Sequence, residues 1–275
     1  MKDYGLMTDF EKRKEAKDIV IAGILTLVMT FMEMSALPAA LFLNIKFKDI
    51  EPIYFALMFN FLIAFVLCGL CRITVLKNWS FGLHSEGIIS GIKGYGLPAL
   101  VATILVAISF CIGLSPLDNK PTVWRVLIEG IIYYVGVGVM EELYLRGLLQ
   151  NIIEKLFSKN KNASLYAILI ASVLFGFGHI FGALGQPVVT IICKAVWATG
   201  LGVYLGAIYV KTRNLWVPII LHTIIDLCGI PVCFSSMSGY PDIALIVSLI
   251  SFVLLGVYGI YVLKHLAHME HHKAD

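Results

Sequence analysis

Charged residues are scarce in this chain. Asp, Glu, Lys and Arg make up 14% of its 275 residues and hydrophobic residues 59%, whereas a typical soluble domain has about 25% charged residues. So few polar side chains cannot cover a water-soluble globule, which excludes a soluble enzyme, a disordered chain and a collagen-like fibre. The net charge of +3 is too small to indicate a nucleic-acid partner. With a mean hydropathy of +0.87, the class that remains is a polytopic membrane protein.

Several familiar catalytic motifs are also absent. The chain has no GxSxG nucleophile elbow, no HExxH zinc motif and no GxxxxGK[ST] phosphate loop. Cys68 and Cys71 form a single CxxC pair. Without a second pair, packing is favoured over metal or redox chemistry, and no disulfide framework is implied.

The hydrophobic runs predict an all-α fold of about eight transmembrane helices around an intramembrane cavity, with residues 1–275 forming a single membrane domain. A transmembrane helix needs about 20 apolar residues, and the first run is too long for the core of a signal peptide. The polar and apolar mixture at 72–94 is expected to lie along the membrane interface. The predicted spans are 19–43, 53–71, 97–114, 123 to beyond 149, 163–181, 188–210, 215–234 and 243–263.

Lys and Arg are unevenly shared between the predicted loops. With the N-terminus in the cytoplasm, sixteen of the 21 fall in cytoplasmic segments, which include the basic N-terminus 1–18 and the polar tail 264–275. Four fall on the outer side, Lys46, Lys48, Lys120 and Arg125, and Lys194 falls inside a span. Cytoplasmic loops of membrane proteins carry an excess of Lys and Arg. We therefore expect a multi-pass protein of the cell membrane, embedded in the lipid bilayer with both termini cytoplasmic.

Ionisable residues inside the predicted spans are candidates for function, because a charge near the centre of the bilayer costs a few kcal/mol or more. Most of them fall in three short segments of the second half of the chain. The candidates are Glu33, Glu129, Glu141, Glu142, Arg146, His179, Lys194, His222 and Asp226.

The first segment contains two adjacent glutamates. Glu142 and Arg146 are four residues apart and share a helix face, so they are predicted to pair. Glu141 points about 100° away from Glu142 and is left for another role. The alternative is a cytoplasmic helix end with solvated charges.

The other two segments each contain a histidine. His179 lies in a glycine-rich stretch in which Gly178 and Gly182 could allow a neighbouring helix to approach. His222 and Asp226 are four residues apart, so the carboxylate could fix the tautomer of the imidazole. A histidine bonded to a carbonyl, or a polar pair that clamps two helices, would explain the same residues.

Together these segments resemble the motifs of the CAAX-prenyl protease and bacteriocin-processing (CPBP, or Abi) family. The motifs are Glu141-Glu142-x-x-x-Arg146, Phe175-x-x-x-His179 and His222-x-x-x-Asp226, within a core at residues 130–229. The resemblance implies an intramembrane endopeptidase with a cavity open toward the cytoplasm. It would cut near the C-terminus, or in a membrane-associated segment, of a peptide or protein substrate.

The resemblance also implies roles for the residues. Glu141 would be the general base, His179 would help it activate water, and Glu142 with Arg146 would order the site. His222 and Asp226 would stabilise the oxyanion. Asp replaces the Asn of eukaryotic-type enzymes at position 226, so it must be protonated, orient His222 or bind a metal.

Two questions stay open from sequence. Zinc is an alternative to a glutamate-activated water, with Glu141, His179, His222 and Asp226 as its possible ligands. A rise of 1.5 Å per residue also places His179 about 10 Å further from the cytoplasmic helix ends than Glu141 and His222. That offset requires a fifth span that starts outside the bilayer or is strongly tilted.

Two non-enzymatic functions compete with the protease. Buried Glu, His, Asp and Lys also build proton pathways in transporters, although no inverted repeat is visible in this chain. A bacteriocin-immunity protein that binds a membrane-active peptide is the other alternative.

Overall fold

The structure, a computed structural model, describes residues 9–43, 52–77, 79–115, 122–234 and 240–272. Side chains are described at the same positions except 9–11, 35–43, 52–60, 125, 129, 233 and 266–272. The predicted outer cations Lys46, Lys48 and Lys120, and the side chains of Arg125 and Glu129, fall outside this description.

All regular secondary structure in the described residues is helical. The helices are α1 (Asp9–Leu43), α2 (Pro52–Thr74), α3 (Ile88–Gly113), α4 (Val123–Glu142), η1 (Leu143–Gln150), α5 (Asn151–Leu156), α6 (Ala163–Phe181), α7 (Val188–Thr212), α8 (Trp216–Asp226), η2 (Leu227–Phe234) and α9 (Asp242–His272).

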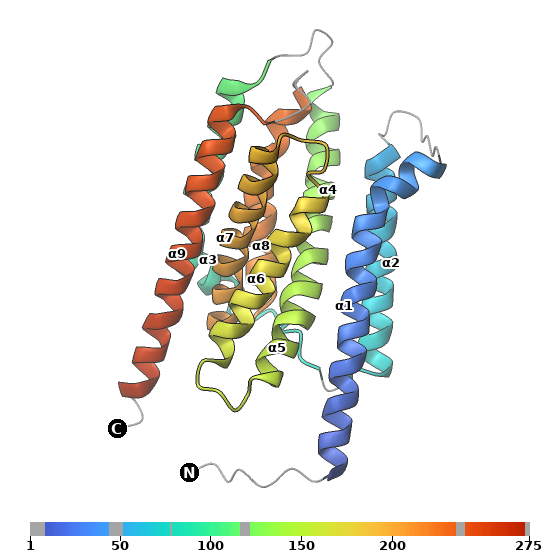
Figure 1. Cartoon of the computed structure of the whole chain (residues 1–275), viewed down its shortest axis with the longest axis vertical. Helices are drawn as coiled ribbons and strands as arrows, with labels where there is room; N and C mark the ends of the chain where they lie inside the picture. The colour runs from blue at the N-terminus through green and yellow to red at the C-terminus, as the bar shows by residue number, and fades with distance from the viewer. Residues whose placement is uncertain (1–8, 44–51, 78, 116–121, 235–239, 273–275) are drawn as a thin grey trace.

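These helices form eight rods in the described part of the chain, because α4, η1 and α5 are continuous and α8 runs directly into η2. The rods lie side by side along the long axis, with α1 and α2 as a pair on one flank (Figure 1). The predicted all-α membrane fold is confirmed. By length and composition α3, α6, α7 and α9 can each cross a membrane; the number of eight spans stays a prediction.

The start of α3 differs from the sequence prediction. The helix begins at Ile88, not near residue 97, so the expected interfacial segment ends early. Gly87, with φ 78°, turns the chain into the helix. Gly91 and Gly96 then face α8, where an added Cβ would lie 2.7 Å from Val217 and 3.3 Å from Leu221. One face of these first turns, that of Gly91 and Gly96, is therefore buried against α8.

The loop before α3 packs beneath η1. Trp79 and Phe81 are buried, and the indole Nε1 of Trp79 donates a hydrogen bond to the carbonyl of Gly147 at 2.7 Å. Gly82 adopts φ 73°, and its carbonyl accepts a hydrogen bond from the N–H of Leu215 at 2.8 Å. An added Cβ at Gly82 would lie 2.5 Å from the carbonyl oxygen of Arg213. Only glycine lets this loop approach the α7–α8 turn so closely.

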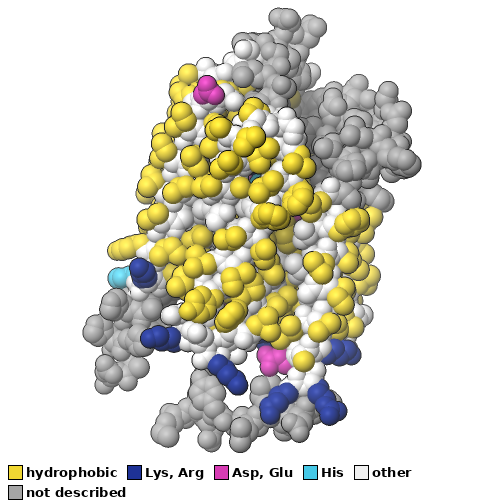
Figure 2. Space-filling view, viewed as in Figure 1, with side chains coloured by type: hydrophobic (Ala, Val, Ile, Leu, Met, Phe, Trp, Pro, Cys, Tyr) yellow, Lys and Arg dark blue, Asp and Glu magenta, His cyan; other side chains and the backbone are white. Residues whose placement is uncertain are grey.

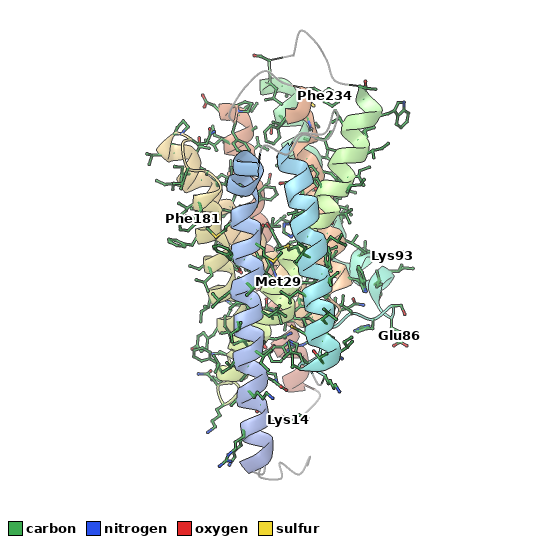
Figure 3. The ribbon with its side chains drawn as sticks, turned by 90° about the vertical axis from the view of Figure 1, so that its right-hand side faces the viewer. Lys14, Met29, Glu86, Lys93, Phe181 and Phe234 are labelled. Atoms are coloured by element: carbon green, nitrogen blue, oxygen red, sulfur yellow. The ribbon has the colours of Figure 1, made fainter. Side chains whose placement is uncertain are left out.

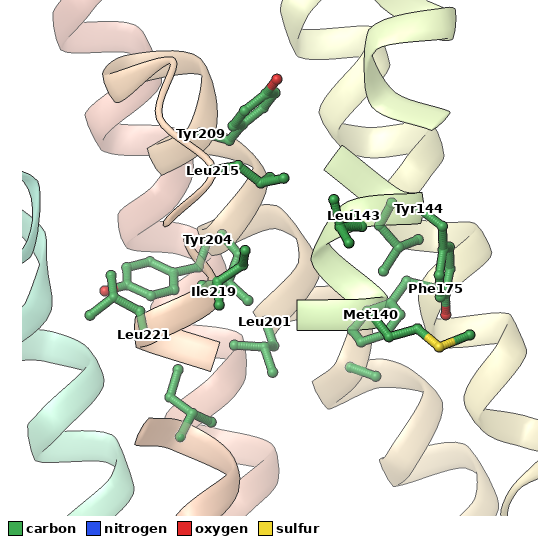
Figure 4. Close-up of a cluster of buried hydrophobic side chains, with 14 of the residues drawn as sticks. Met140, Leu143, Tyr144, Phe175, Leu201, Tyr204, Tyr209, Leu215, Ile219 and Leu221 are labelled. Carbon is green, nitrogen blue, oxygen red and sulfur yellow. The ribbon is translucent and has the colours of Figure 1, made fainter. Parts of the chain in front are cut away.

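The core is built around α7. Every residue from Leu201 to Tyr209 is buried, as expected for a helix surrounded on all sides. Figure 4 shows how side chains of four rods meet there. The labelled residues are Met140, Leu143 and Tyr144 from α4 and η1, Phe175 from α6, Leu201, Tyr204 and Tyr209 from α7, and Leu215, Ile219 and Leu221 at α8.

The surface separates apolar and basic regions. On the face shown in Figure 2, hydrophobic side chains cover the length of the rods, and Lys and Arg gather at the lower end. Asp9 of α1 and His272 of α9 lie at this same end (Figure 1). Figure 3 places Lys14 near it, and Phe181 and Phe234 toward the opposite end. Assignment of the basic end to the cytoplasm stays a prediction.

The expected helix approach at Gly178 is wrong. An added Cβ at Gly178 would meet nothing within 4 Å. Two residues earlier, an added Cβ at Gly176 would collide with Thr199 Oγ1 and with the carbonyl oxygen of Ala195. Since α6 turns about 100° per residue, glycines two apart face different neighbours, and Gly176 is the one that faces α7.

Gly176→Ala and Gly178→Ala form a matched pair that tests this contact. We expect Gly176→Ala to destabilise the protein by about 1–3 kcal/mol, the usual cost of overpacking. Gly178→Ala should leave stability unchanged or slightly higher. Thermal unfolding in detergent measures both, and equal midpoints would show that α6 and α7 do not meet at Gly176.

Candidate functional site

The residues of the three motifs meet where α4, η1, α6, α7 and α8 pack together. Glu141 and Glu142 end α4, and Arg146 lies in η1, a π-helical segment in which hydrogen bonds reach five residues back instead of four. All of η1 except Leu149 is buried. The wider turn carries Arg146 into the interior of the bundle beside Glu142.

Glu142 is the centre of the polar network. It is completely buried, and its Oε1 accepts hydrogen bonds from Arg146 Nη1 at 2.8 Å and from His222 Nδ1 at 2.8 Å. Arg146 also donates through Nη2 to the carbonyl of Gly202 at 3.0 Å, and its guanidinium lies 5.5 Å from the centre of the Phe175 ring. One carboxylate therefore links α4, η1 and α8, and the arginine extends the network to α6 and α7.

The partner of His222 differs from the one that the spacing favours. Its Nδ1 bonds to Glu142, on another helix, while Asp226 Oδ2 lies 3.7 Å from Nε2, too far for a hydrogen bond. Glu142 rather than Asp226 therefore orients the imidazole. The other nitrogen, Nε2, is directed between Asp226 and Glu141, whose Oε2 lies 3.5 Å away.

Glu141 keeps an unused acceptor. Its side chain is 7% exposed, and Oε2 is buried with no hydrogen-bond partner among the described residues. On its other side lies Glu33 of α1, which comes within hydrogen-bonding reach of Glu141 and accepts a hydrogen bond from the hydroxyl of Tyr144 at 2.7 Å. Oε2 of Glu142 is buried without such a partner as well, but Glu141 lines the cavity described below and Glu142 does not. A buried acceptor without a partner is costly, and at Glu141 the adjoining cavity allows a water to fill that place.

His179 reaches the same region by folding back along α6. Its Nδ1 bonds to the carbonyl of Phe175 at 3.0 Å, so the ring points toward the start of the helix, as side chains on helices do. This direction reduces the depth offset expected from sequence. The Phe175 ring lies 4.4 Å from the ring of His179 and 6.0 Å from that of His222, edge-on to both.

A cavity of about 530 Å³ joins these side chains. Glu141, His179, His222 and Asp226 all line it. It extends to Gly182, Ala183 and Gln186 in the α6–α7 connection, at the end of the bundle opposite Asp9 and His272. The resemblance implied a cavity open at the end that carries the termini. At that end the buried loop with Trp79 and Phe81 packs beneath η1, and neither residue lines this cavity.

The possible zinc ligands do not converge as the ligands of a metal site do. Among the residues that the structure describes, no three His, Cys, Asp or Glu side chains are arranged to hold a metal ion. His179 Nδ1 is already bonded to the backbone carbonyl of Phe175, and His222 Nδ1 is bonded to Glu142. The set Glu141, His179, His222 and Asp226 therefore does not fit a zinc centre in this conformation.

The structure brings together every candidate of the three motifs and adds features that the sequence did not predict. These are the hydrogen bond between Glu142 and His222, the position of Glu33 beside Glu141 and hydrogen-bonded to Tyr144, and the position of Lys194 in the cavity wall. Glu33 and Lys194 were visible in the sequence as ionisable residues inside predicted spans. Their place at the site was not, because it depends on how distant helices pack.

Two arginine–glutamate pairs among the described residues allow a direct test of the network. Removing one partner of a buried ion pair costs about 3–5 kcal/mol, so Arg146→Met should lower the unfolding midpoint and the yield strongly. Arg213 pairs with Glu154, but its side chain is 52% exposed, and exposed pairs contribute about 0–1 kcal/mol. Arg213→Met should therefore be nearly neutral. Similar losses in thermal unfolding would contradict a central role for the buried pair.

Comparison with known proteins agrees with the motifs. Residues 123–228, from the start of α4 into η2, match the family model described as "Type II CAAX prenyl endopeptidase Rce1-like". This segment contains Glu141, Glu142, Arg146, His179, Lys194, His222 and Asp226. No curated protein matches the chain.

The matched segment covers all three motifs in order, and its helices build the cavity around them. This match supports membership of the CPBP family for residues 123–228, and the apolar helices give the chain the fold of a membrane protein.

Proposed function

We propose that the protein is an intramembrane endopeptidase whose water is activated by Glu141. The observation that carries the proposal is the position of Glu141 Oε2. This oxygen forms no hydrogen bond with a described residue and lies in the cavity wall 3.5 Å from Nε2 of an imidazole that Glu142 holds in place. Peptide hydrolysis requires an activated water and donors directed at the developing negative charge. This cavity offers both.

In the proposed reaction Glu141 takes a proton from the water, and the resulting hydroxide attacks the scissile carbonyl. His222, as an imidazolium, donates from Nε2 to the oxyanion of the tetrahedral intermediate. His179, with Nδ1 held by the Phe175 carbonyl, uses its other nitrogen to position the water. Glu141 then returns the proton to the leaving amine as the peptide bond breaks.

Asp226 and Glu142 stabilise the charge on His222 in this scheme. Glu142 bonds to Nδ1, and Asp226 lies 3.7 Å from Nε2, close enough to compensate the imidazolium without displacing the substrate. This arrangement removes the difficulty of an ionised Asp beside an oxyanion. Asp226 stabilises the positive charge of His222, and His222 donates the hydrogen bond to the oxyanion.

The substrate in this proposal is a peptide or protein segment that reaches the cavity within the bilayer. The family name supports a substrate cut near a prenylated C-terminus. We further propose that the protein lies in the cell membrane with both termini cytoplasmic, because the basic residues favour that orientation. The cavity then extends toward the side of the membrane away from the termini.

Glu141→Gln is the decisive variant. We expect it to abolish cleavage of S-farnesylated CAAX peptides in proteoliposomes, because an amide cannot accept the proton of the water. Glu154→Gln, on the same rod but outside the cavity, is the matched control and should retain activity. Mass spectrometry of the released peptides measures both. Equal cleavage by wild-type protein and Glu141→Gln would end the proposal.

The same assay separates the alternatives. A transporter or an immunity protein would bind its peptide or ion and release no cleavage product. His222→Gln should reduce turnover by about 100- to 1,000-fold, the usual effect of losing an oxyanion donor. Asp226→Asn should keep much of the activity. If Asp226→Asn loses activity, and metal chelators inactivate the wild-type enzyme, the reaction depends on a metal and the scheme above is wrong.

A further inference from the structure

Lys194 is a cation in the cavity wall that the proposed reaction does not use. It lies on α7, and its ammonium is 6.0 Å from the centre of the Tyr240 ring. No described residue forms a hydrogen bond or ion pair with it, although the charges of Glu141 and Asp226 act on it from further away. An ammonium inside a membrane protein is costly unless an anion compensates it. The cavity therefore has room for an anionic ligand at Lys194.

The position of Lys194 fits an anion carried by the substrate. Gly202, on the same helix, marks the level of the catalytic network because its carbonyl accepts the hydrogen bond from Arg146. Lys194 precedes it by eight residues, which corresponds to about 12 Å along the helix axis. An extended peptide covers about 3.3–3.6 Å per residue. About three residues of an extended peptide would therefore cover the distance along α7 from the level of Gly202 to Lys194.

The wall around Lys194 is suited to apolar residues. Trp197 and Tyr240 pack with their ring centres 5.3 Å apart, and Phe110 lies 5.6 Å from Tyr240. Phe252 packs against Trp197 on the other side. All four line the cavity. This part of the cavity thus combines aromatic surface with a single cation, a pattern that suits a short apolar peptide ending in a carboxylate.

We propose that Lys194 determines specificity by binding a carboxylate on the leaving-group side of the scissile bond, about three residues beyond it. This inference rests on the proposed endopeptidase function. The carboxylate is either the C-terminus of the substrate or an acidic side chain near it. Both would form the same charge-assisted hydrogen bond, so peptide chemistry must separate the two sources.

Lys194 also has a structural alternative, in which it serves only to balance the charge of Asp226. That role would affect all peptides equally, whatever their C-terminal group. Binding of the substrate carboxylate instead makes the effect of Lys194 depend on the peptide. The two roles are therefore distinguished by comparing a free acid with its amide.

The experiment measures peptide binding in the inactive Glu141→Gln protein, so that no cleavage occurs. The probes are a fluorescent S-farnesyl CAAX peptide as the free acid, the same peptide as its C-terminal amide, and the amide with Glu as its last residue. We expect the free acid to bind about 10- to 100-fold more tightly than the amide, as for hydrogen bonds to charged groups. Adding Lys194→Met should remove this preference, and Lys194→Arg should keep most of it.

Lys211→Met is the matched control, since Lys211 lies on α7 outside the residues that line the cavity. It should keep the full preference for the free acid. If the amide ending in Glu binds as tightly as the free acid, and loses affinity in Lys194→Met, a side-chain carboxylate also satisfies Lys194. Equal binding of acid and amide in the parent protein, or a preference that survives Lys194→Met, would overturn the proposal. Because only binding is measured, these results are independent of whether the wild-type protein cleaves the peptides.

Discussion

A fully buried carboxylate, Glu142, is the constraint on which the rest of the site depends. Its negative charge has no access to water, so it must be compensated by groups inside the bundle. Arg146 and His222 do so through the same oxygen, each at 2.8 Å. Because Glu142 must bond to both Arg146 and His222, the rotation of α4 and η1 relative to α8 is fixed. That rotation leaves Glu141, one residue earlier and about 100° around the helix, facing the cavity with an oxygen that no described residue uses.

The surrounding helices hold this geometry by close packing in addition to polar bonds such as that from Arg146 to the carbonyl of Gly202. Gly176 lets α6 approach α7, and Phe175 beside it packs against the guanidinium of Arg146 and near the rings of His179 and His222. The loop with Trp79 and Phe81 packs beneath η1 and neither residue lines the cavity, which extends toward the other end of the bundle. The catalytic groups therefore lie at the inner end of a cavity whose opposite wall carries aromatic residues and Lys194.

The spacing of residues in the sequence predicted side-chain contacts within one helix correctly, but it did not predict contacts between different helices. The four-residue spacing of Glu142 and Arg146 predicted their contact, and the apolar runs predicted most helices to within a few residues. The same spacing favoured Asp226 as the partner of His222, because a sequence does not show that a carboxylate from α4 comes closer. The glycines illustrate the same limit: Gly176 and Gly178 look equivalent in sequence, and only the rotation of α6 shows which one meets a neighbour. The start of α3 could not be predicted for a related reason. Its first turns are rich in glycine and have few apolar side chains, and only their packing against α8 shows that they belong to the helix.

The hydrogen bond between Glu142 and His222 can be observed directly. In protein labelled with ¹⁵N-histidine, the His222 signals are assigned by their loss in His222→Gln, and the nitrogen and proton shifts report which ring nitrogen carries a proton. The account predicts a protonated Nδ1 in a strong hydrogen bond, with a proton shifted far downfield that moves in Glu142→Gln. A neutral His222 protonated only at Nε2 would show that Glu142 does not orient the imidazole, and would contradict the arrangement on which the proposed reaction is built.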